Sequence, residues 1–573
     1  MKKASLICVA AWWLLINVSF AVAIAAPAPG QAGIATAHPL ATQAGYEILE
    51  AGGNAFDAAV AISAALGVVE PYASGLGGGA FWLLHVVDDR VDDGAEGGRD
   101  AGHDVFIDAR EVAPAAATAD MYLDRDGKPI RGASFNGPLA AGIPGQPAGL
   151  VHLAKHYGRL PLARSLAPAI RFAEDGVPVH RRMVLGLRFR RRAAERWPAF
   201  GEIYYPDGEN PEIGDVLRQP DLAATLRRLA NGGFDGFYRG KTARLLVDGV
   251  QDAGGIWTLD DFAGYRAIER EPISFFYHGV RVVSAPLPSS GGILLANIFN
   301  ILSGYDLADM DSAVRKHLII ESMRRAYRDR AEYLGDADFA AVPVERLTHP
   351  YYAAGQRMSI RADRATPSET LAGFQAPIDK GTETTHFSVM DADGNRVAGT
   401  MSVNMWYGSA FMAPGTGLVL NNEMDDFAIK PGVPNYFGLP GYSANAIEPG
   451  KRMLSSMSPT FLESDRGIAI LGTPGGSRII TMVLLAAMAW MDGADATEMV
   501  ELKRYHHQFT PDQVGYEAGA FTPEEEEALR RRGHGLGETG RAYGNMNVVT
   551  WDFETGKVEA ATDPRGQGEG RVY

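Results

Sequence analysis

The stretch from residue 384 to residue 404 constrains the fold most, because two β-prone runs flank the turn sequence Asp-Ala-Asp-Gly-Asn at 391–395. Gly394 accepts the left-handed conformation that closes a three-residue hairpin loop. Pairing residue 391 with residue 395 then places Thr384 directly opposite Ser402. Since side chains alternate between the two faces of a strand, Asn404 is expected on the face of Ser402.

This register predicts two hydroxyls and an amide together at one end of a hairpin. On the hairpin alone, Thr–Ser cross-strand pairing in an ordinary sheet is the favoured interpretation, and a functional group is the alternative. The remaining motifs of the chain have to decide between these interpretations.

The composition is that of a globular protein with ample core for one large domain or several smaller ones. Of the 573 residues, 46% are hydrophobic and 21% are charged, which is an ordinary proportion. The formal net charge of -15 argues against binding a phosphate backbone, which needs clustered Lys and Arg. We therefore expect no nucleic-acid partner. The basic run 181–192 is interpreted as a solvated helix face, with nucleic-acid binding as the alternative.

Residues 1–25 are predicted to form an export signal. Lys2 and Lys3 precede an apolar stretch, and small residues at 21–25 offer cleavage sites; a retained anchor is the alternative. The sole cysteine, Cys8, lies in this segment, so the mature chain is expected to form no disulfides. No later stretch is long and apolar enough to span a bilayer. We expect a bacterial periplasmic or secreted protein without a stable membrane anchor.

The first 380 residues are predicted to form mostly helices, with two strands among them. Helices are expected at 39–51 and at 55–66, where Asn54 caps the second and Asp57 supports its N-terminus. Strands are expected at 80–87 and 105–108, with a solvated loop at 88–104. Residues 137–350 are predicted to be mainly helical, including 147–156 and 318–334. The polar stretch 362–380 is expected to be an exposed, cleavable loop. No linker or repeat divides the chain.

Clustered glycines occur at two places. The run Ser-Gly-Leu-Gly-Gly-Gly at 74–79 lacks the Gly-Lys-Ser/Thr of a P-loop and follows a helix, so we expect close backbone packing and not nucleotide binding. Gly475 and Gly476 lie between a predicted strand (468–471) and a helix. Adjacent glycine N–H groups at a helix start are a suitable oxyanion site.

Four motifs together show a family resemblance. They are Thr-Thr-His at 384–386, Leu-Asn-Asn-Glu-Met-Asp-Asp-Phe at 420–427, Leu-Ser-Ser-Met-Ser-Pro at 454–459, and Pro-Gly-Gly-Ser-Arg at 474–478. With supporting matches at 53–60, 110–114 and 506–508, the chain resembles the γ-glutamyltranspeptidases, or glutathione hydrolases, from about residue 35 to residue 564. The resemblance implies an α+β fold, the four-layer αββα sandwich of N-terminal nucleophile hydrolases.

The resemblance implies a precursor that cuts itself between Glu383 and Thr384. Residues 26–383 would form a large subunit and 384–573 a small subunit of one interlocked catalytic domain. Thr384 would be the nucleophile, with its freed α-amino group as base. Ser402 would hydrogen-bond Thr384, and Asn404 would orient the substrate. Gly475 and Gly476 would donate N–H groups to the oxyanion.

The same resemblance assigns a binding site for the γ-glutamyl zwitterion. Arg110, Ser455 and Ser456 would hold the α-carboxylate, whereas Glu423 and Asp426 would hold the α-ammonium. This division agrees with the chemistry, because a zwitterion needs cationic and N–H donors at one end and carboxylates at the other. No metal or other cofactor is required.

Three positions depart from the common family pattern. Ser402 stands where threonine is usual, which keeps the hydroxyl. Phe437 stands where bacterial members often have a lid tyrosine, so the contact of the lid (430–441) with Asn404 is in question. Lys503 stands where members of the family frequently have a proline.

The implied activity is that of a γ-glutamyltransferase and glutathione hydrolase. It would transfer the γ-glutamyl group of glutathione and related compounds, through an ester on Thr384, to water, amino acids or dipeptides. Two alternatives remain. A cephalosporin or glutaryl acylase on the same scaffold would not need Glu423 and Asp426. An inactive binding homologue would not need Thr384.

Overall fold

The computed structural model describes residues 28–87, 102–371 and 384–573. Several predictions fall outside these residues. They are the export signal at 1–25, most of the loop at 88–104, the last part of the stretch 362–380, and Glu383 on the N-terminal side of the expected cleavage site.

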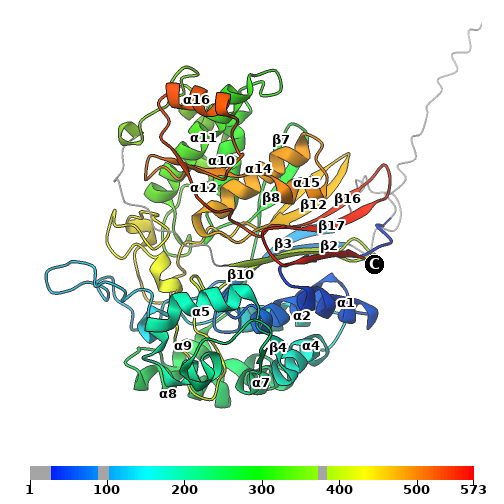
Figure 1. The fold of residues 1–573 in the computed structure, drawn as a ribbon, viewed down its shortest axis with the longest axis vertical. Helices are drawn as coiled ribbons and strands as arrows, with labels where there is room; N and C mark the ends of the chain where they lie inside the picture. Colours follow the sequence, from blue (N-terminus) through cyan, green and yellow to red (C-terminus); the bar gives the residue numbers. More distant parts are fainter. Residues whose placement is uncertain (1–27, 88–101, 372–383) are drawn as a thin grey trace, which may run out of the picture.

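Two antiparallel sheets form the centre of the molecule (Figure 1). The first has the strand order β18-β1-β9-β10-β2-β3-β6. Its strands are β1 (Gly33–Thr36), β2 (Gly79–Val87), β3 (Gly102–Ala109), β6 (Ile268–Arg270), β9 (Thr385–Met390), β10 (Arg396–Ser402) and β18 (Glu569–Val572). The second has the order β17-β16-β12-β11-β8-β7. Its strands are β7 (Ile273–Tyr277), β8 (Val280–Ser284), β11 (Thr460–Ser464), β12 (Gly467–Gly472), β16 (Asn547–Asp552) and β17 (Val558–Thr562).

Helices cover the outer face of each sheet. The first sheet is covered by α1 (Pro39–Glu50), α2 (Ala55–Val69), α3 (Gln146–His156), α4 (Leu162–Asp175), α5 (Arg181–Ala194), α6 (Pro198–Tyr204), α7 (Pro220–Tyr238), α8 (Gly240–Asp252) and α9 (Leu259–Gly264). The second is covered by α10 (Gly291–Leu302), α11 (Ser312–Tyr333), α12 (Val344–Leu347), α13 (Pro350–Arg357), α14 (Ile479–Met491), α15 (Ala496–Glu501) and α16 (Pro523–Arg531). Figure 1 shows these two groups on opposite sides of the sheets. The predicted four-layer α+β sandwich is therefore confirmed.

The alternation of side chains along β2 explains why the layers stack in this way. Phe81 and Leu83 belong to the hydrophobic core that includes the space between the sheets. Trp82 and Leu84 belong to the core under the first layer of helices. All four side chains are fully buried, because each face of the strand packs against another layer.

The first two helices begin and end close to their predicted positions. In α2, Asn54 accepts hydrogen bonds from the N–H groups of Phe56 and Asp57, and Asp57 accepts one from the N–H of Asn54. This capping box satisfies the exposed donors of the first turn. Asp57 also accepts from the backbone of Arg159, so its predicted structural role is confirmed.

Three predictions of secondary structure need correction. The region 137–350 is mainly helical, as predicted, but it also contains five short strands, among them β6, β7 and β8, which the prediction missed because they are short and irregular in polarity. Strand β3 begins at Gly102, three residues before its predicted start, through pairing with β2. In the stretch 362–380, Ser368 is buried in a short 3-10 helix (Ser368–Leu371) and donates its N–H to Asp512.

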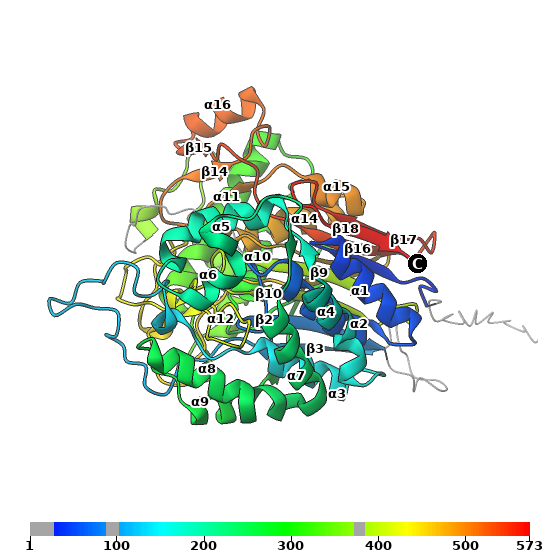
Figure 2. The same cartoon turned by 60° about the horizontal axis from the view of Figure 1, so that its bottom comes forward.

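The chain segments before and after Thr384 are interleaved. Strands β9 and β10 form the predicted hairpin and lie between β1 and β2, near the middle of the first sheet. Figure 2 shows β17 and β18 near the N-terminal helix α1, and the N–H of Tyr573 donates to the carbonyl of Ala32. Smaller sheets join β13 (Tyr505–His506), β14 (Val514–Tyr516) and β15 (Leu536–Glu538), and β4 (Val177–Pro178) with β5 (Val216–Leu217). Among the described helices, none combines the length and the apolarity that crossing a bilayer requires.

Candidate active site

Thr384 lies immediately before β9, and its hydroxyl faces Ser402. The ladder pairs Thr385 with Met401, which is the predicted register. The two hydroxyl oxygens of Thr384 and Ser402 are 3.3 Å apart, and both residues are buried. The sequence therefore predicted the central pair of this site correctly from the turn and the strand period.

Asn404 reaches the same site for a different reason than predicted. Strand β10 ends at Ser402, and Asn404 has a φ of 72°, a left-handed conformation that asparagine tolerates. Its N–H donates to the Ser402 hydroxyl at 2.8 Å, and its side-chain amide donates to the carbonyl of Asn422 at 2.9 Å. A turn positions Asn404, and strand alternation does not.

Gly475 and Gly476 follow β12 and open a short 3-10 helix (Gly476–Arg478) that continues into α14. Their φ angles are 151° and 56°, which glycine adopts without steric cost. Within the described part of the chain, neither N–H donates a hydrogen bond. Unpaired adjacent donors beside Thr384 are suited to stabilising an oxyanion.

A cluster of one cation and three acids forms the opposite wall. The Arg110 guanidinium lies 2.6 Å from Asp426, 3.2 Å from Glu423 and 3.6 Å from Glu111. Its Nε donates to the carbonyl of Met453. Burial raises the pKa of Glu423 well above its usual value, although the Arg110 charge opposes this shift. Burial alone would lower the pKa of Arg110, but the three carboxylates raise it overall.

Ser455 and Ser456 form a third wall, with a second buried arginine behind them. The Ser455 hydroxyl accepts from the N–H of Met457 at 3.1 Å. Arg330, on α11, donates to the hydroxyls of Ser456 at 3.3 Å and Ser290 at 3.0 Å. Burial lowers the pKa of Arg330 to about 10, so the side chain is still charged at neutral pH. Arg330 has no ion-pair partner among the described residues.

The segment 430–441, which the family resemblance assigns as a lid, packs directly on Gly476. Gly476 has no side chain, and a Cβ there would lie 2.5 Å from the Phe437 ring. Asp425 accepts from the N–H of Tyr436 at 2.8 Å, and Asn435 donates to Asp426 at 3.0 Å. The lid is thus tied to the acidic segment 423–426. Phe437 provides no hydroxyl for Asn404, whose amide is bonded to Asn422.

These walls enclose a small cavity of about 20 Å³. It is lined by nine predicted residues: Arg110, Thr384, Ser402, Asn404, Glu423, Asp426, Ser455, Ser456 and Gly476. Gly475 lies next to the cavity without lining it. The structure thus gathers residues from segments that are more than 300 positions apart in the sequence, since 316 positions separate Arg110 from Asp426.

His386 is not placed to act as a base for Thr384. Its two ring nitrogens form hydrogen bonds with the hydroxyls of Thr400 and Ser388 at 2.8 and 3.2 Å. Burial lowers its pKa to about 3. His386 is therefore a neutral, buried side chain whose hydrogen bonds stabilise the interior between the two sheets.

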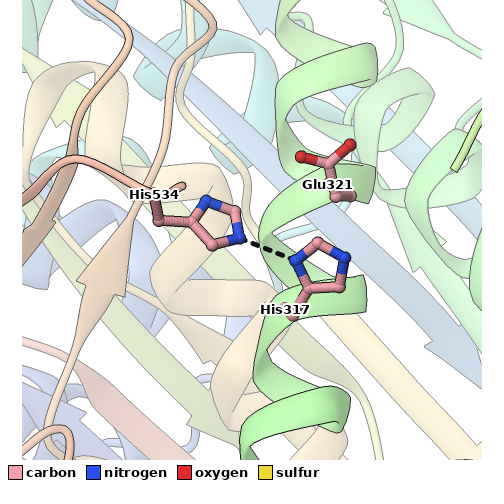
Figure 3. A group of neighbouring side chains, drawn as sticks. All are labelled: His317, Glu321 and His534. Carbon is pink, nitrogen blue, oxygen red and sulfur yellow. Dashed lines mark hydrogen bonds between the residues drawn. The ribbon is translucent and has the colours of Figure 1, made fainter. Parts of the chain in front are cut away.

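A second polar group, away from the cavity, has the composition of a metal site (Figure 3). His317 and Glu321 lie one turn apart on α11, facing His534. However, the rings of His317 and His534 are hydrogen-bonded at 2.7 Å. Glu321 forms ion pairs with Arg324 and Arg325, whose positive charge opposes a cation. These contacts favour a structural network joining α11 to the segment around residue 534.

Sequence reasoning missed Glu111 and Arg330. Glu111 was part of a supporting motif, but its neighbour Arg110 received the functional assignment. Arg330 lies in a predicted amphipathic helix, where an arginine is normally expected to face solvent. Its burial depends on helix orientation, which periodicity does not reveal for a helix with polar residues on every face.

The comparisons agree with this geometry. The family model described as gamma-glutamyltranspeptidase matches residues 41–573. A glutathione hydrolase proenzyme of Pseudomonas sp. (strain A14) is 42% identical over 505 residues, covering 87% of this chain and 85% of the relative. The glutathione hydrolase proenzyme of Escherichia coli (strain K12) is 39% identical over 574 residues, covering 96% of each. The crystal structure of a cephalosporin acylase from Bacillus halodurans has a TM-score of 0.81 at 30% identity, covering 94% of this chain and 95% of that one. The chain therefore belongs to the gamma-glutamyltranspeptidase family.

Proposed function

We propose that this protein is a γ-glutamyltransferase and glutathione hydrolase that matures by cutting itself between Glu383 and Thr384. As a member of this family it is an enzyme with an N-terminal nucleophile. The observation that carries the proposal is one cavity that brings together the Thr384–Ser402 hydroxyl pair, the unpaired N–H of Gly476, and Arg110 with the acids Glu423 and Asp426.

Maturation begins with attack of the Thr384 hydroxyl on the carbonyl of Glu383. The peptide bond becomes an ester, which water then hydrolyses, leaving residues 26–383 and 384–573 as separate chains. The new α-amino group of Thr384 has an ordinary pKa of about 7.7–8.0, so it is partly neutral near pH 7 and serves as a base. The two subunits stay together because β9 and β10 lie between β1 and β2.

Catalysis then uses the same hydroxyl. Thr384 attacks the γ-amide carbonyl of the substrate, and the N–H groups of Gly475 and Gly476 stabilise the oxyanion. Each such donor typically contributes about 2.7–4 kcal/mol in the transition state. The amine or Cys-Gly leaves with a proton, and the γ-glutamyl ester passes to water, an amino acid or a dipeptide. Asn404 orients the substrate.

Charge balance supports recognition of an α-ammonium group. Arg110 supplies one positive charge against the carboxylates of Glu111, Glu423 and Asp426. Burial and the neighbouring carboxylates raise the pKa of Glu423 well above its usual value and that of Glu111 to about 7, so these acids lack enough positive charge nearby to ionise readily. A substrate ammonium beside Glu423 and Asp426 would favour their ionised forms and pair with them.

The α-carboxylate of the substrate is assigned to Ser455, Ser456 and Arg110. Most donors of Arg110 are already engaged by acids and by Met453. We therefore add Arg330 as a positioning residue, because its guanidinium lies behind Ser456 and has hydroxyl partners instead of carboxylates.

The second candidate is a glutaryl or cephalosporin acylase, which the similarity to the Bacillus halodurans acylase favours. The two functions are separated by assaying purified protein on γ-glutamyl-p-nitroanilide and on glutaryl-p-nitroanilide, which lacks the ammonium group. We expect the γ-glutamyl substrate to have the higher kcat/KM. A preference for the glutaryl amide would replace the proposal by the acylase function.

The location belongs to the proposal as well. The expected export signal at 1–25 and the bacterial relatives support a periplasmic or secreted enzyme. Fractionation of expressing cells checks this, with activity expected outside the cytoplasm and a protein that has lost its first residues.

A further inference from the structure

The outer side of helix α5 (Arg181–Ala194) takes no part in the site described above. The helix contains six arginines and no acidic residue, although the chain as a whole has a formal net charge of -15. Figures 1 and 2 show α5 on the outside of the molecule. The basic run of the sequence is therefore a surface that a partner can reach.

One side of α5 carries arginines and apolar residues together. Successive helical residues are about 100° apart around the axis, so five positions fall within about 100° of one another: Arg181, Leu185, Arg188, Phe189 and Arg192. All five side chains are exposed, and the exposed fractions of Leu185 and Phe189 are 45% and 54%. We call these five residues the α5 face.

The opposite side of α5 is fixed to the body of the protein. A Cβ on Gly186 would lie 2.5 Å from the Trp406 ring, so the two segments are in close contact. Buried Arg190 donates to the carbonyls of Phe135 at 3.2 Å and Gly408 at 2.8 Å. The α5 face is thus already ordered, and a partner does not have to supply the free energy of folding the helix.

The three arginines of the α5 face are not neutralised by neighbouring acids. Within the described residues, no ion pair joins any of them to a carboxylate. Glu195 and Glu209 lie 3.6 and 3.9 Å from Arg191 instead, and Arg191 is outside the face. The positive charge of the face is therefore available to an anionic partner.

A hollow of about 380 Å³ adjoins the α5 face and extends its positive charge. Arg181 and Leu185 line it together with Arg541 and Arg565, which come from the far end of the chain. Arg565 is engaged by two carboxylates, whereas Arg541 is exposed and no carboxylate lines the hollow. The positive surface thus continues beyond the helix.

The mixture of charges and apolar groups favours one kind of partner. The surface of an anionic bilayer has phosphate groups above an apolar layer, so it binds arginines and accepts apolar side chains between them. The face is also long enough to contact several head groups, since residues 181 to 192 span about 16 Å of helix. Nucleic acid would use the arginines but not Leu185 and Phe189. A second copy of this acidic chain would be repelled by its like net charge.

We propose that the α5 face docks reversibly on a bilayer that contains anionic phospholipids. Arg181, Arg188 and Arg192 contact lipid phosphates, and Leu185 and Phe189 enter the head-group layer. Two apolar side chains bury too little area for permanent insertion, which agrees with the expectation that the protein has no stable membrane anchor. This role goes beyond the proposed function and does not depend on it.

The contribution of charge is tested by co-sedimentation of the purified protein with vesicles of phosphatidylcholine, with and without one-third phosphatidylglycerol. We expect binding at low salt to the anionic vesicles, and a steep loss at about 0.5 M salt, where charges are screened. The variant Arg181→Gln/Arg188→Gln/Arg192→Gln should bind about a hundredfold more weakly, since one basic residue at an anionic surface changes binding about fivefold.

A matched variant separates the α5 face from overall charge. Arg244, Arg530 and Arg531 are exposed arginines of α8 and α16, and their replacement by glutamine removes the same charge. This control should bind the anionic vesicles like the unmodified protein. Equal weakening in the two triple variants would overturn the proposal, and so would an unmodified protein that does not bind the anionic vesicles at low salt.

The apolar contribution is tested by Leu185→Ser/Phe189→Ser. This variant should bind about tenfold more weakly at low and at moderate salt, because salt does not screen apolar burial. Tyr351→Ser/Met358→Ser is its control, since these side chains on and just after α13 are also highly exposed. All variants should unfold near the temperature of the unmodified protein, because exposed side chains contribute little to stability.

Two further measurements test the other partners. A DNA duplex that binds as tightly as the vesicles, and depends on the three arginines but not on Leu185 and Phe189, would assign the α5 face to nucleic acid and overturn the proposal. A dimer in sedimentation velocity that the Leu185→Ser/Phe189→Ser variant dissociates would assign it to a second copy of the chain. We expect no DNA binding of that strength and no such dimer.

Discussion

Replacing Asp426 by asparagine tests the charge cluster most sharply. The carboxylate of Asp426 accepts hydrogen bonds from Arg110 at 2.6 Å and from Asn435 at 3.0 Å. An asparagine of the same shape keeps one acceptor but turns an NH₂ group toward one of these donors. The change therefore removes a charge from the cluster without leaving a cavity.

The magnitude follows from the contacts. A hydrogen bond to a charged group contributes about 1.5–3 kcal/mol, so kcat/KM for a γ-glutamyl substrate should fall about ten- to a hundredfold or more. The mismatch with Arg110 or Asn435 should also lower the free energy of unfolding by about 1–3 kcal/mol. Cleavage before Thr384 should persist, because Asp426 takes no part in that step.

The assay compares γ-glutamyl-p-nitroanilide with glutaryl-p-nitroanilide in each variant. Asp425→Asn is the control, because Asp425 is a buried neighbour bonded to Ser134 and to the backbone of Tyr436 and does not line the cavity. Asp426→Asn should change the ratio of the two substrates tenfold or more, whereas Asp425→Asn should affect both substrates alike. Equal losses on both substrates in Asp426→Asn, with both subunits formed, would refute recognition of the ammonium group.

Three further predictions follow from the site and the core. Thr384→Ala should run as one uncut band on a denaturing gel, since no hydroxyl attacks the preceding carbonyl; two bands would contradict self-cleavage. Ser402→Ala should lower kcat about tenfold or more and stability by about 1–3 kcal/mol, because it leaves the buried N–H of Asn404 unpaired; Ser402→Thr should retain most activity, and a Thr variant as impaired as Ala would show that the hydroxyl is unimportant. Burial lowers the pKa of His386 and His506 to about 3, against about 6.5 in the unfolded chain. Because the unfolded state binds more protons below pH 6.5, their contribution to stability is complete above that pH and is lost as the pH falls toward 3. Thermal unfolding should therefore occur at lower temperature at pH 5 than at pH 7, and an equal or higher temperature would contradict the neutral burial of these rings.

Local patterns predicted the elements that depend on local chemistry. The hairpin register followed from Gly394 and the strand period, and the structure has the same pairing. Asn54 and Asp57 predicted the start of α2 through a capping box that spans only three residues. The short strands β6, β7 and β8 were missed, since a strand of three to five residues has too few positions for its alternation to be recognised.

The sequence by itself determined the family, the nucleophile candidate and nine of the residues that line the cavity, because motif identity and turn chemistry reside in contiguous segments. The tertiary structure alone decided how these residues meet. It paired Arg110 with Glu423 and Asp426 and placed Arg330 behind Ser456. It also gave Asn404 itself a left-handed backbone conformation. The physical reason is that contacts between distant segments depend on how whole layers pack, and no spacing in the sequence encodes the relative position of two packed elements.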